Sequence, residues 1–406
     1  PVGAQTSPTG SSVAMNGVVV DQKAMDFEPE IDEDARIVRV SAVTNLKLLQ
    51  DKVRSLGLEL PPDPTSAPDC TVGGAVATNA SGPSTFRLGS MATYVRALRV
   101  VDGRGRTHRV QRSRVDKAAM GPVSLQDPTR FFVGSEGLLG IIVDIELSLI
   151  PAPETTWAIF AGFPSRIALI KAVIGLRESR HSLPIRAVEW LDRACCALLR
   201  ERPGRLALPE SGGGALYVEI DGSEAQVESA TERVAQILET EGALMNQAQI
   251  LQNKSAIDGF DELRHRVPDT LNHQGSAHKK SAGGGKLSTD WSVPMNVLED
   301  ILLWTDEALE EIGLDGLYSY GHIGNGHPHQ NLICPNAEVR EKAMEVLRHQ
   351  LTRVVRLGGV PTSEHGIGKI KRELVKPYLP YGFRETLKAL KQVFDPDDLF
   401  ARGNIV

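Results

Sequence analysis

Residues 320–331 read YGHIGNGHPHQN and hold three histidines within eight positions. If the Asn-Gly pair at 325 and 326 forms a two-residue hairpin turn, His322 falls opposite His329 on the paired strands. Opposed residues of an antiparallel pair have Cβ atoms roughly 4.5–5.5 Å apart, a separation from which two imidazoles can bind one metal ion. The alternative is a hairpin whose histidines face solvent, but three clustered histidines favour a metal site.

A carboxylate that would complete such a site is Glu364, in the sequence SEHGIGK. Imidazole and carboxylate ligands with open coordination positions are typical of a catalytic metal centre. Zinc is the first expectation for this ligand set, and manganese and iron(II) are the alternatives. The sequence therefore predicts a divalent metal site formed by His322, His329 and Glu364.

Three segments are dense in Gly, Ser, Thr and Asn: residues 3–12 (GAQTSPTGSS), 70–89 (CTVGGAVATNASGPSTFRLG) and 134–140 (GSEGLLG). Small residues let the backbone approach a ligand closely, and clustered N–H groups and hydroxyls suit a pyrophosphate. Taken alone, each segment is better explained as a turn, and the sequence has neither a Walker A motif nor a GxGxxG after a strand. Together they indicate a phosphate-bearing cofactor in another kind of nucleotide site.

The length of 406 residues suits two or three domains. The charged fraction of 24%, the net charge of −6 and the hydrophobic fraction of 41% are those of an ordinary soluble protein, without the basic excess that binds nucleic acid. Four cysteines without a CxxC spacing predict neither a disulfide framework nor a cysteine-bound iron–sulfur or zinc site. We therefore expect no nucleic-acid partner, and no cysteine-bound metal site or iron–sulfur cluster on this chain.

Membrane and targeting signals are weak. No apolar run approaches the ~20 residues that span a bilayer, so no transmembrane segment is expected. The first residues, PVGAQTSPTGSS, lack the basic and apolar parts of a signal peptide. We expect an intracellular soluble protein of the cytoplasm or the mitochondrial matrix, or one peripheral to a membrane respiratory complex.

Residues 1–150 are expected to form one domain, because short β-branched runs of period 2 alternate there with Gly and Pro. The predicted strands lie at 17–21, 35–43, 94–110 and 140–150. One helix is predicted over 45–56, and Gly57 follows it at a position that favours glycine.

After PAPE at 151–154, amphipathic helices alternate with strands, so residues 151–385 are expected to form a second, α+β domain. The stretch 276–285 (SAHKKSAGGG) is predicted to be a mobile loop. A last helix ends at Asp395-Pro396, and residues 386–406 are expected to return to the first domain. The helices predicted in the second domain lie at 165–179, 224–242, 296–311 and 337–357, with a strand at 215–221.

The glycine-rich segments carry a family resemblance. PPDPTSAPDCTVGGAVATNASG, YVRALRVVDGRG and GSEGLLGIIVDIELSLIP resemble the FAD domain of the vanillyl-alcohol-oxidase-like flavoproteins, in the branch of D-lactate dehydrogenases, D-2-hydroxyglutarate dehydrogenases and glycolate oxidase subunits. The resemblance covers almost the whole chain. It implies an α+β fold with an FAD-binding domain of this type, a substrate (cap) domain with an antiparallel sheet, and a C-terminal helical segment. Family members usually have several tens of residues before the GAQTS-like segment, so an amino-terminally truncated FAD domain is expected here.

The resemblance also implies which residues contact FAD. Residues 3–10 would form a pyrophosphate loop, and residues within 62–82 and 134–141 would line the flavin and its diphosphate. The implied FAD-binding residues are Gly3, Gln5, Thr6, Ser7, Thr9, Gly10, Pro62, Cys70, Thr71, Gly73, Gly74, Thr78, Asn79, Ser81, Gly82, Gly134, Gly137, Ile141 and Asn404.

The family pattern at the metal site reads roughly GHxGDGNxHxN and, further on, EHGIG, with the first and last histidines and the glutamate as ligands. His322, His329 and Glu364 match those positions. This chain has Asn325 where the family usually has Asp, and His327 where it usually has Asn. His327 is therefore left outside the implied ligand set.

Oxidation of a 2-hydroxy acid to a 2-oxo acid needs a clamp for the carboxylate, a base for the hydroxyl proton and a hydride acceptor facing C2. Arg264 and Lys286 match basic positions of the family and are implied to bind the substrate carboxylate. His365, beside Glu364, is the candidate base, with a hydrogen-bonded structural histidine as the alternative. Hydride would pass from C2 to N5 of FAD.

The resemblance allows more than one substrate and more than one electron acceptor. The acid is D-lactate, glycolate or D-2-hydroxyglutarate, and the electron acceptor is a quinone, a cytochrome, an electron-transferring flavoprotein or an iron–sulfur subunit. The oligomeric state, a homo-oligomer included, and the covalent or noncovalent attachment of FAD are undecided. Two alternatives remain: a noncatalytic flavin-binding subunit of such a dehydrogenase complex, and a metal-binding module or hydrolase that uses the histidines without flavin.

Overall fold

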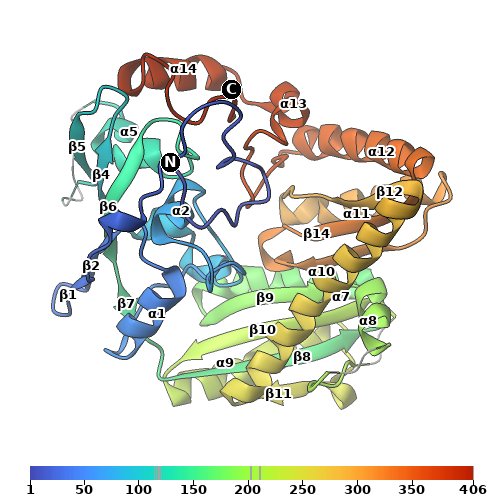
Figure 1. Cartoon of the computed structure of the whole chain (residues 1–406). Helices are drawn as coiled ribbons and strands as arrows, with labels where there is room; N and C mark the ends of the chain where they lie inside the picture. Colours follow the sequence, from blue (N-terminus) through green and yellow to red (C-terminus); the bar gives the residue numbers. More distant parts are fainter. Residues whose placement is uncertain are drawn as a thin grey trace. The chain divides into compact units, whose positions relative to one another are not determined.

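The computed structural model describes residues 1–113, 115, 117, 119, 121–201, 204–209 and 212–405. The chain divides into two compact units, and Figure 1 labels many of their elements. Unit 1 consists of residues 1–84, 88–152 and 364–406, and unit 2 consists of residues 85–87 and 153–363. The sequence predicts domain boundaries after 150 and 385, whereas the units change after 152 and 363, so the segment that begins at Glu364 belongs to unit 1.

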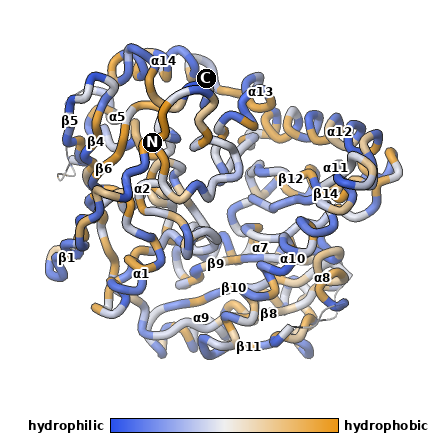
Figure 2. Tube along the Cα trace, in the orientation of Figure 1, coloured by the Kyte–Doolittle hydropathy of each residue, from blue (hydrophilic) through white to orange (hydrophobic). Residues whose placement is uncertain are grey.

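Unit 1 contains a five-stranded antiparallel sheet in the order β1-β2-β6-β4-β5, and a second sheet that pairs β3 with β7. In β6, buried residues alternate with half-buried ones over most of the strand, as its period-2 sequence predicts. Figure 2 shows hydrophobic residues interspersed with hydrophilic ones along β4 and β6. The strands are β1 (Glu30–Asp32), β2 (Ile37–Ser41), β3 (Leu58–Glu59), β4 (Val95–Val101), β5 (Thr107–Gln111), β6 (Ile141–Ser148) and β7 (Ile150–Pro151).

The helices of unit 1 are mostly short. Helix α1 begins at the predicted place because the Asn45 side chain accepts a hydrogen bond from the Leu48 N–H at 2.9 Å, and Gly57 follows the helix with φ 73°. The helices are η1 (Lys23–Met25), α1 (Leu46–Arg54), α2 (Val72–Ala77), α4 (Met91–Tyr94), α5 (Val123–Gln126), α6 (Thr129–Phe132), α13 (Arg372–Val375), η6 (Lys376–Tyr378) and α14 (Phe383–Phe394); α3 (Thr85–Leu88) begins in unit 2 and ends in unit 1.

One strand predicted for unit 1 is wrong. Residues 17–21 (GVVVD) form only an isolated bridge between Val2 and Asp21. Val18 is 87% exposed, so the apolar run has no neighbouring strand against which to bury its side chains. An apolar, β-branched run therefore does not by itself place these residues in a sheet.

Unit 2 contains a seven-stranded antiparallel sheet in the order β11-β8-β10-β9-β13-β14-β12. Every residue of the central strand β9 is buried, because helices cover both faces of the sheet. The strands are β8 (Thr155–Phe163), β9 (Ile185–Leu191), β10 (Gly214–Gly222), β11 (Gln249–Leu251), β12 (Gly283–Ser288), β13 (Leu317–Gly321) and β14 (His329–Asn336).

The two faces of this sheet are covered by different helices. Phe260 and Leu263 of α10 share one apolar cluster with Leu191, Tyr217 and Tyr320 of the strands, so α10 covers their face. Helix α12 covers the other face, where its Gln350 hydrogen-bonds Gln330 of β14 at 2.6 Å. The helices of unit 2 are α7 (Arg166–Glu178), η2 (Ser179–His181), α8 (Arg193–Arg200), α9 (Glu224–Thr240), η3 (Met245–Gln247), α10 (Lys254–Ala282), η4 (Met295–Val297), α11 (Leu298–Glu310), η5 (Ile323–Asn325) and α12 (Ala337–Arg356).

The prediction of a mobile loop at 276–285 is also wrong. Its first part is the end of α10, and its last residues open β12. Gly283 ends the helix with φ 71°, a left-handed conformation that glycine adopts without strain. The glycines that follow pair with β14 in the register Gly285↔Cys334, so backbone hydrogen bonds order a segment whose composition alone suggested a loop.

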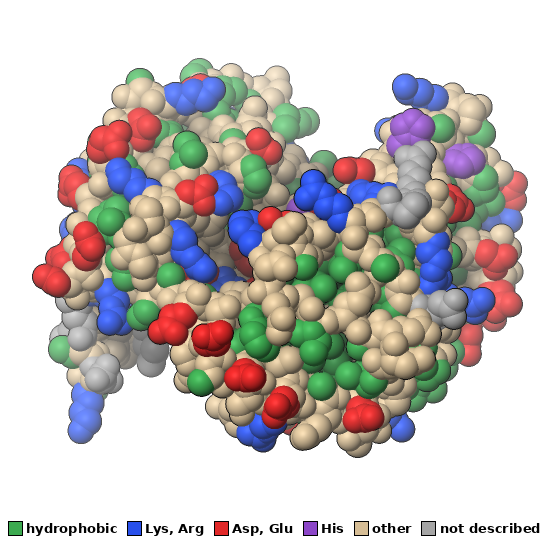
Figure 3. All heavy atoms as spheres, turned by 90° about the horizontal axis from the view of Figure 1, so that it is seen from below, with side chains coloured by type: hydrophobic (Ala, Val, Ile, Leu, Met, Phe, Trp, Pro, Cys, Tyr) green, Lys and Arg blue, Asp and Glu red, His purple; other side chains and the backbone are tan. Residues whose placement is uncertain are grey.

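Among the helices of the described residues, none is long and apolar enough to cross a membrane. On the face drawn in Figure 3, Lys and Arg side chains are interspersed with Asp and Glu side chains, in keeping with the net charge of −6.

A buried carboxylate, that of Glu136, fixes the last segment of unit 1. Its two oxygens accept hydrogen bonds from the Ile367 and Gly368 backbone N–H groups, each at 2.7 Å, and its backbone carbonyl accepts one from Asn404 Nδ2 at 3.1 Å. Burial raises the pKa of the Glu136 carboxyl, while these N–H groups and the charges of Lys371 and Lys369 act in the opposite direction. The carboxylate thus holds the EHGIG run against the GSEG turn.

Glu136→Gln should lower the free energy of unfolding by about 1–3 kcal/mol, because an amide can accept only one of the two N–H bonds and leaves the other donor buried. Urea unfolding followed by circular dichroism checks this. Tryptophan fluorescence serves as a separate readout of unit 2, which holds Trp157, Trp190, Trp291 and Trp304. Glu33→Gln, at an exposed glutamate of unit 1, is the control, and equal unfolding midpoints for the two variants would contradict the assignment.

Candidate active site

The histidine-rich segment does join two antiparallel strands, but not by the predicted turn. Strands β13 and β14 pair in the register Tyr320↔His329, so Tyr320, and not His322, lies opposite His329. Residues 322–328 form the connection, in which the His322 carbonyl accepts hydrogen bonds from the Asn325 and His327 N–H groups at 3.0 and 3.2 Å. A two-residue hairpin would have placed His322 and His327 in the paired strands, whereas here both belong to this helical turn.

The three imidazoles nevertheless lie together. Ring centroids are 5.2 Å apart for His322 and His329, 4.7 Å for His327 and His329, and 5.8 Å for His322 and His327. Ring nitrogens of His322 and His329 lie within 4.8 Å of each other. Within unit 2, therefore, the two histidines predicted as metal ligands are neighbours.

His322 is oriented by a buried carboxylate from β9. Its Nδ1 is 2.7 Å from Oε1 of Glu189, and its Nε2 is 3.2 Å from Nη2 of Arg264. A guanidinium can only donate hydrogen bonds, so Nε2 is the acceptor and Nδ1 carries the proton that is donated to Glu189. Arg264 Nε is also 2.9 Å from the other carboxylate oxygen of Glu189, which closes a three-residue cluster.

His327 is held separately. Its Nδ1 donates to the Trp291 carbonyl at 2.7 Å, and its Nε2 is 3.6 Å from Oδ1 of Asp290. Asp290 in turn accepts a hydrogen bond from Thr362 Oγ1 at 2.7 Å. His327, which is 3% exposed, is thus fixed by its own partners beside the other two rings.

Lys286 lies on the same sheet face as His329. Ser288, two residues along β12, donates to Asn331 Oδ1 at 2.8 Å, and Asn331 is two residues along β14 from His329. Because side chains alternate along strands, Lys286 shares this face, which α10 covers. Lys286 is half-buried, and burial lowers the pKa of its ammonium group.

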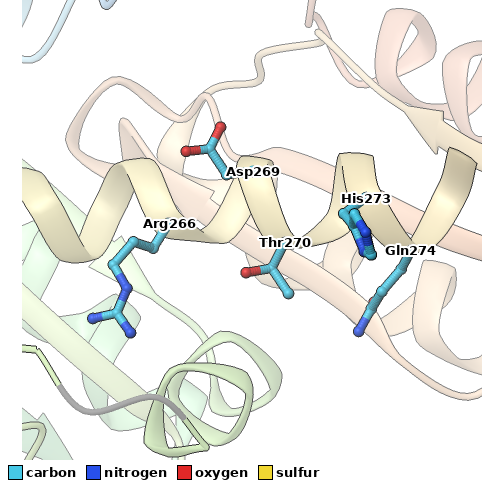
Figure 4. A pocket seen from close by; sticks show the side chains of 5 residues that line it. All are labelled: Arg266, Asp269, Thr270, His273 and Gln274. Carbon is cyan, nitrogen blue, oxygen red and sulfur yellow. The ribbon is translucent and has the colours of Figure 1, made fainter.

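A pocket of about 300 Å³ lies along another face of α10, lined by Arg266, Asp269, Thr270, His273 and Gln274 (Figure 4). Arg266 follows Arg264 by two positions, so the two side chains leave the helix about 200° apart. No predicted site residue lines this pocket, and the pocket is not part of the candidate site.

In unit 1, the glycine-rich segments meet around α2. The Thr71 hydroxyl caps this helix by accepting the Gly74 N–H at 3.1 Å, and a Cβ on Gly3 would lie 2.6 Å from the same oxygen. The Gly134 N–H donates to the Val76 carbonyl at 3.0 Å. Segments 3–10, 70–82 and 134–141 therefore form one wall, and its small residues fit the close backbone approach that a dinucleotide needs.

Some predicted flavin contacts already have protein partners. The Asn404 amide donates to the Ser11 carbonyl at 3.0 Å and to the Glu136 carbonyl, and its oxygen accepts from Lys369 Nζ at 2.6 Å. Asn79 Oδ1 accepts the Ala92 N–H at 2.9 Å. These two amides hold the wall in shape. Cys70 is buried, and burial raises the pKa of its thiol.

Glu364 and His365 belong to unit 1. The Glu364 carboxylate lies beside Ser81, with Glu364 Oε1 3.4 Å from Ser81 Oγ. Glu364 and His365 are both half-buried. Since Ser81 is in the predicted flavin segment, the predicted third metal ligand lies beside that segment within unit 1.

Sequence reasoning missed Glu136, Glu189 and Asp290. Glu136 and Glu189 stand out in retrospect as lone acids in a glycine-rich and an apolar run, GSEGLLG and IRAVEWL. A charge in a buried strand must be paired, and that requirement is the signal which would have found Glu189.

Comparison with known proteins now identifies the family. Residues 152–405 match the family described as FAD linked oxidases, C-terminal domain, and residues 1–111 match the FAD binding domain. A D-lactate dehydrogenase of Archaeoglobus fulgidus is 28% identical over 414 residues, which cover 100% of this chain and 85% of the relative. The glycolate oxidase subunit GlcD of Bacillus subtilis is 27% identical, over 98% of this chain and 81% of the relative. A D-2-hydroxyglutarate dehydrogenase of Stutzerimonas stutzeri is 27% identical, over 100% and 85%.

Among solved structures, an alkyldihydroxyacetonephosphate synthase superposes with a TM-score of 0.65 at 16% identity, covering 94% of this chain and 67% of that one. This likeness shows the fold, and it confirms the predicted FAD-binding domain joined to an antiparallel cap sheet. Because the C-terminal family match spans more than half of the chain, the protein belongs to the family of FAD-linked oxidases.

Proposed function

We propose that the protein oxidises a small 2-hydroxy acid, of the D-lactate, glycolate or D-2-hydroxyglutarate type, to its 2-oxo acid. The observation that carries this proposal is the set of basic and imidazole side chains that α10, the β13–β14 connection and one face of the sheet supply in unit 2: Arg264, His322, Lys286 and His329. Relatives that match this chain almost end to end are dehydrogenases of such acids. FAD, when bound, accepts the hydride from C2 at its N5.

The proposed metal ligands are His322, His329 and Glu364. Zinc is the first candidate, with manganese and iron(II) as alternatives. Support comes from the donor types and from the His322 tautomer, whose Nε2 lone pair suits a metal bond. A bound divalent ion would lower the pKa of a coordinated hydroxyl group.

The chain's own residues would perform the remaining steps. Arg264 and Lys286 would bind the substrate carboxylate through a guanidinium fork and an ammonium charge. His365 would accept the hydroxyl proton as hydride leaves C2. Residues 3–10, 70–82 and 134–141 would line FAD, while Asn404 keeps this wall in place.

The reduced flavin must pass its electrons on. We propose a quinone, a cytochrome, an electron-transferring flavoprotein or an iron–sulfur subunit as the acceptor class, and the cytoplasm or mitochondrial matrix as the compartment. Relatives named as mitochondrial D-lactate dehydrogenases support the second option, for example one from Danio rerio.

The FAD-loaded chain should lose its oxidised-flavin absorbance when one of D-lactate, glycolate or D-2-hydroxyglutarate is added under anaerobic conditions. Visible spectra recorded during titration with each acid check this. A chain that binds FAD but is bleached by none of the three acids would be the noncatalytic flavin-binding subunit. A chain with the histidine-bound metal and no flavin would be the metal-binding module or hydrolase.

His322→Gln and His329→Gln should each lower kcat/KM by more than about 100-fold, since even changes behind a metal ligand cost about 10–100-fold. Chelation should inactivate the wild-type protein but add little to either variant. Steady-state assays before and after chelation measure both effects. His349→Gln, at an exposed histidine of α12, is the matched control, and a chelator-insensitive wild-type enzyme would refute the metal's role.

Lys286→Met should raise KM for the acid by at least about 10-fold and change kcat less, because it removes a charge that binds the carboxylate in ground and transition states alike. Initial rates over a range of acid concentrations separate the two parameters. Lys279→Met, at an exposed position of α10, should leave KM unchanged. An equal loss in both variants would show that Lys286 does not contact the substrate.

A further inference from the structure

Glu189 is the most deeply buried acidic residue near the candidate site. It lies in β9, whose sequence is IRAVEWL and whose residues are all buried, and it is 1% exposed. A carboxylate in such a place is stable only when cations and hydrogen-bond donors surround it. Its partners are therefore fixed by the fold and not by solvent.

The two oxygens of this carboxylate serve two different side chains. Oε1 is 2.7 Å from Nδ1 of His322, and Oε2 is 2.9 Å from Nε of Arg264. These partners come from separate parts of the sequence, one from the loop between β13 and β14 and the other from α10. Glu189 thus sets the position of a histidine and an arginine at once.

The hydrogen-bond roles follow from chemistry. An ionised carboxylate only accepts, so the His322 Nδ1 must carry the proton, and the lone pair is left on Nε2. Arg264 Nη2 donates to that lone pair at 3.2 Å. A cation bound at Nε2 would replace this donor, and the salt bridge to Glu189 would keep the displaced guanidinium within reach of a substrate carboxylate.

We propose that Glu189 is a positioning residue: it holds His322 in the tautomer that presents Nε2 to a divalent cation, and it keeps Arg264 beside that nitrogen. This inference rests on the proposed function, because it concerns the metal-binding role of His322. It differs from a purely structural role, in which Glu189 would only neutralise a buried arginine.

The same sheet offers a matched comparison. Glu219 of β10 lies 3.3 Å from Arg186 Nε through its Oε1, and its Oε2 accepts the Tyr217 hydroxyl at 2.7 Å. It is therefore a second carboxylate paired with an arginine in the sheet, with no histidine among these partners. Glu219→Gln removes an acid–arginine pair as Glu189→Gln does, but leaves the histidine cluster untouched.

The test measures metal affinity of the whole FAD-loaded chain, with Zn²⁺ and Mn²⁺ as the probes and competition with a chromophoric chelator as the readout. Glu189→Gln should weaken binding by about 10–100-fold, because an amide can rotate and donate to Nδ1, which moves the proton to Nε2. Glu219→Gln should bind as the wild type does, and circular dichroism should show that both variants are folded.

Each outcome is decisive. Equal affinity of Glu189→Gln and the wild type would overturn the positioning role while leaving the metal site in place. An equal loss of metal affinity in both variants would show that Glu189 acts only as a structural partner of Arg264. A wild-type chain that binds neither ion would overturn both this inference and the proposed metal site, whereas flavin bleaching by an acid would still be measurable on its own.

A second measurement does not depend on any Glu189 variant folding. Long-range ¹H–¹⁵N correlation spectra of metal-free protein labelled with ¹⁵N-histidine distinguish the two neutral tautomers of each ring. The chain has ten histidines, and the His322 signals are those lost in His322→Gln. The proposal requires the Nδ1–H tautomer at His322, and the Nε2–H tautomer there would refute it.

Discussion

The charge of one buried carboxylate, that of Glu189, constrains how the arginine and histidine side chains of the candidate site are arranged in unit 2. An acid in a fully buried strand costs several kcal/mol unless it is paired, so the fold must bring it a cation and a donor. Helix α10 supplies Arg264, and the loop after β13 supplies His322. The helix, the loop and the strand are therefore held together by the Arg264–Glu189 ion pair and by the two hydrogen bonds of His322, and the remaining histidines pack beside these three residues.

Unit 1 also contains a buried carboxylate, that of Glu136, which needs hydrogen-bond donors. Here the carboxylate binds backbone N–H groups of Ile367 and Gly368, so it orders the segment that carries Glu364 and His365. The glycine-rich wall needs such ordering because its small residues contribute little packing of their own. In both units, an acid that takes no part in the chemistry holds in place the residues proposed to perform it.

The sequence was sufficient for most of the architecture. Period 2 predicted β2, β4 and β6, and amphipathic runs predicted α7, α9, α11 and α12, because burial of one face decides these elements. The predictions from sequence failed where pairing with a distant strand decides whether a segment forms a strand or a loop. The glycines of 283–285 are ordered by β14, and residues 17–21 stay out of the sheet although their pattern suits a strand.

The candidate site was predictable to a similar degree. The spacing of His322 and His329 indicated that they are close, and they are, although the register at Tyr320 shows that the predicted turn was the wrong reason. The carboxylate that orients His322 lies 133 residues away in the sequence, so no local pattern connects the two. Residue types therefore suggested which side chains to consider, and the fold was needed to find the carboxylate that orients His322.

We propose that hydride leaves C2 of a 2-hydroxy acid and reduces the flavin of this chain. The most direct measurement is the anaerobic stopped-flow rate of flavin reduction in the metal-loaded protein, with acid carrying either hydrogen or deuterium at C2. We expect slower reduction with deuterium, because the C2–H bond breaks as the flavin is reduced. Equal rates with the two forms, or no reduction by any of the three acids, would contradict it.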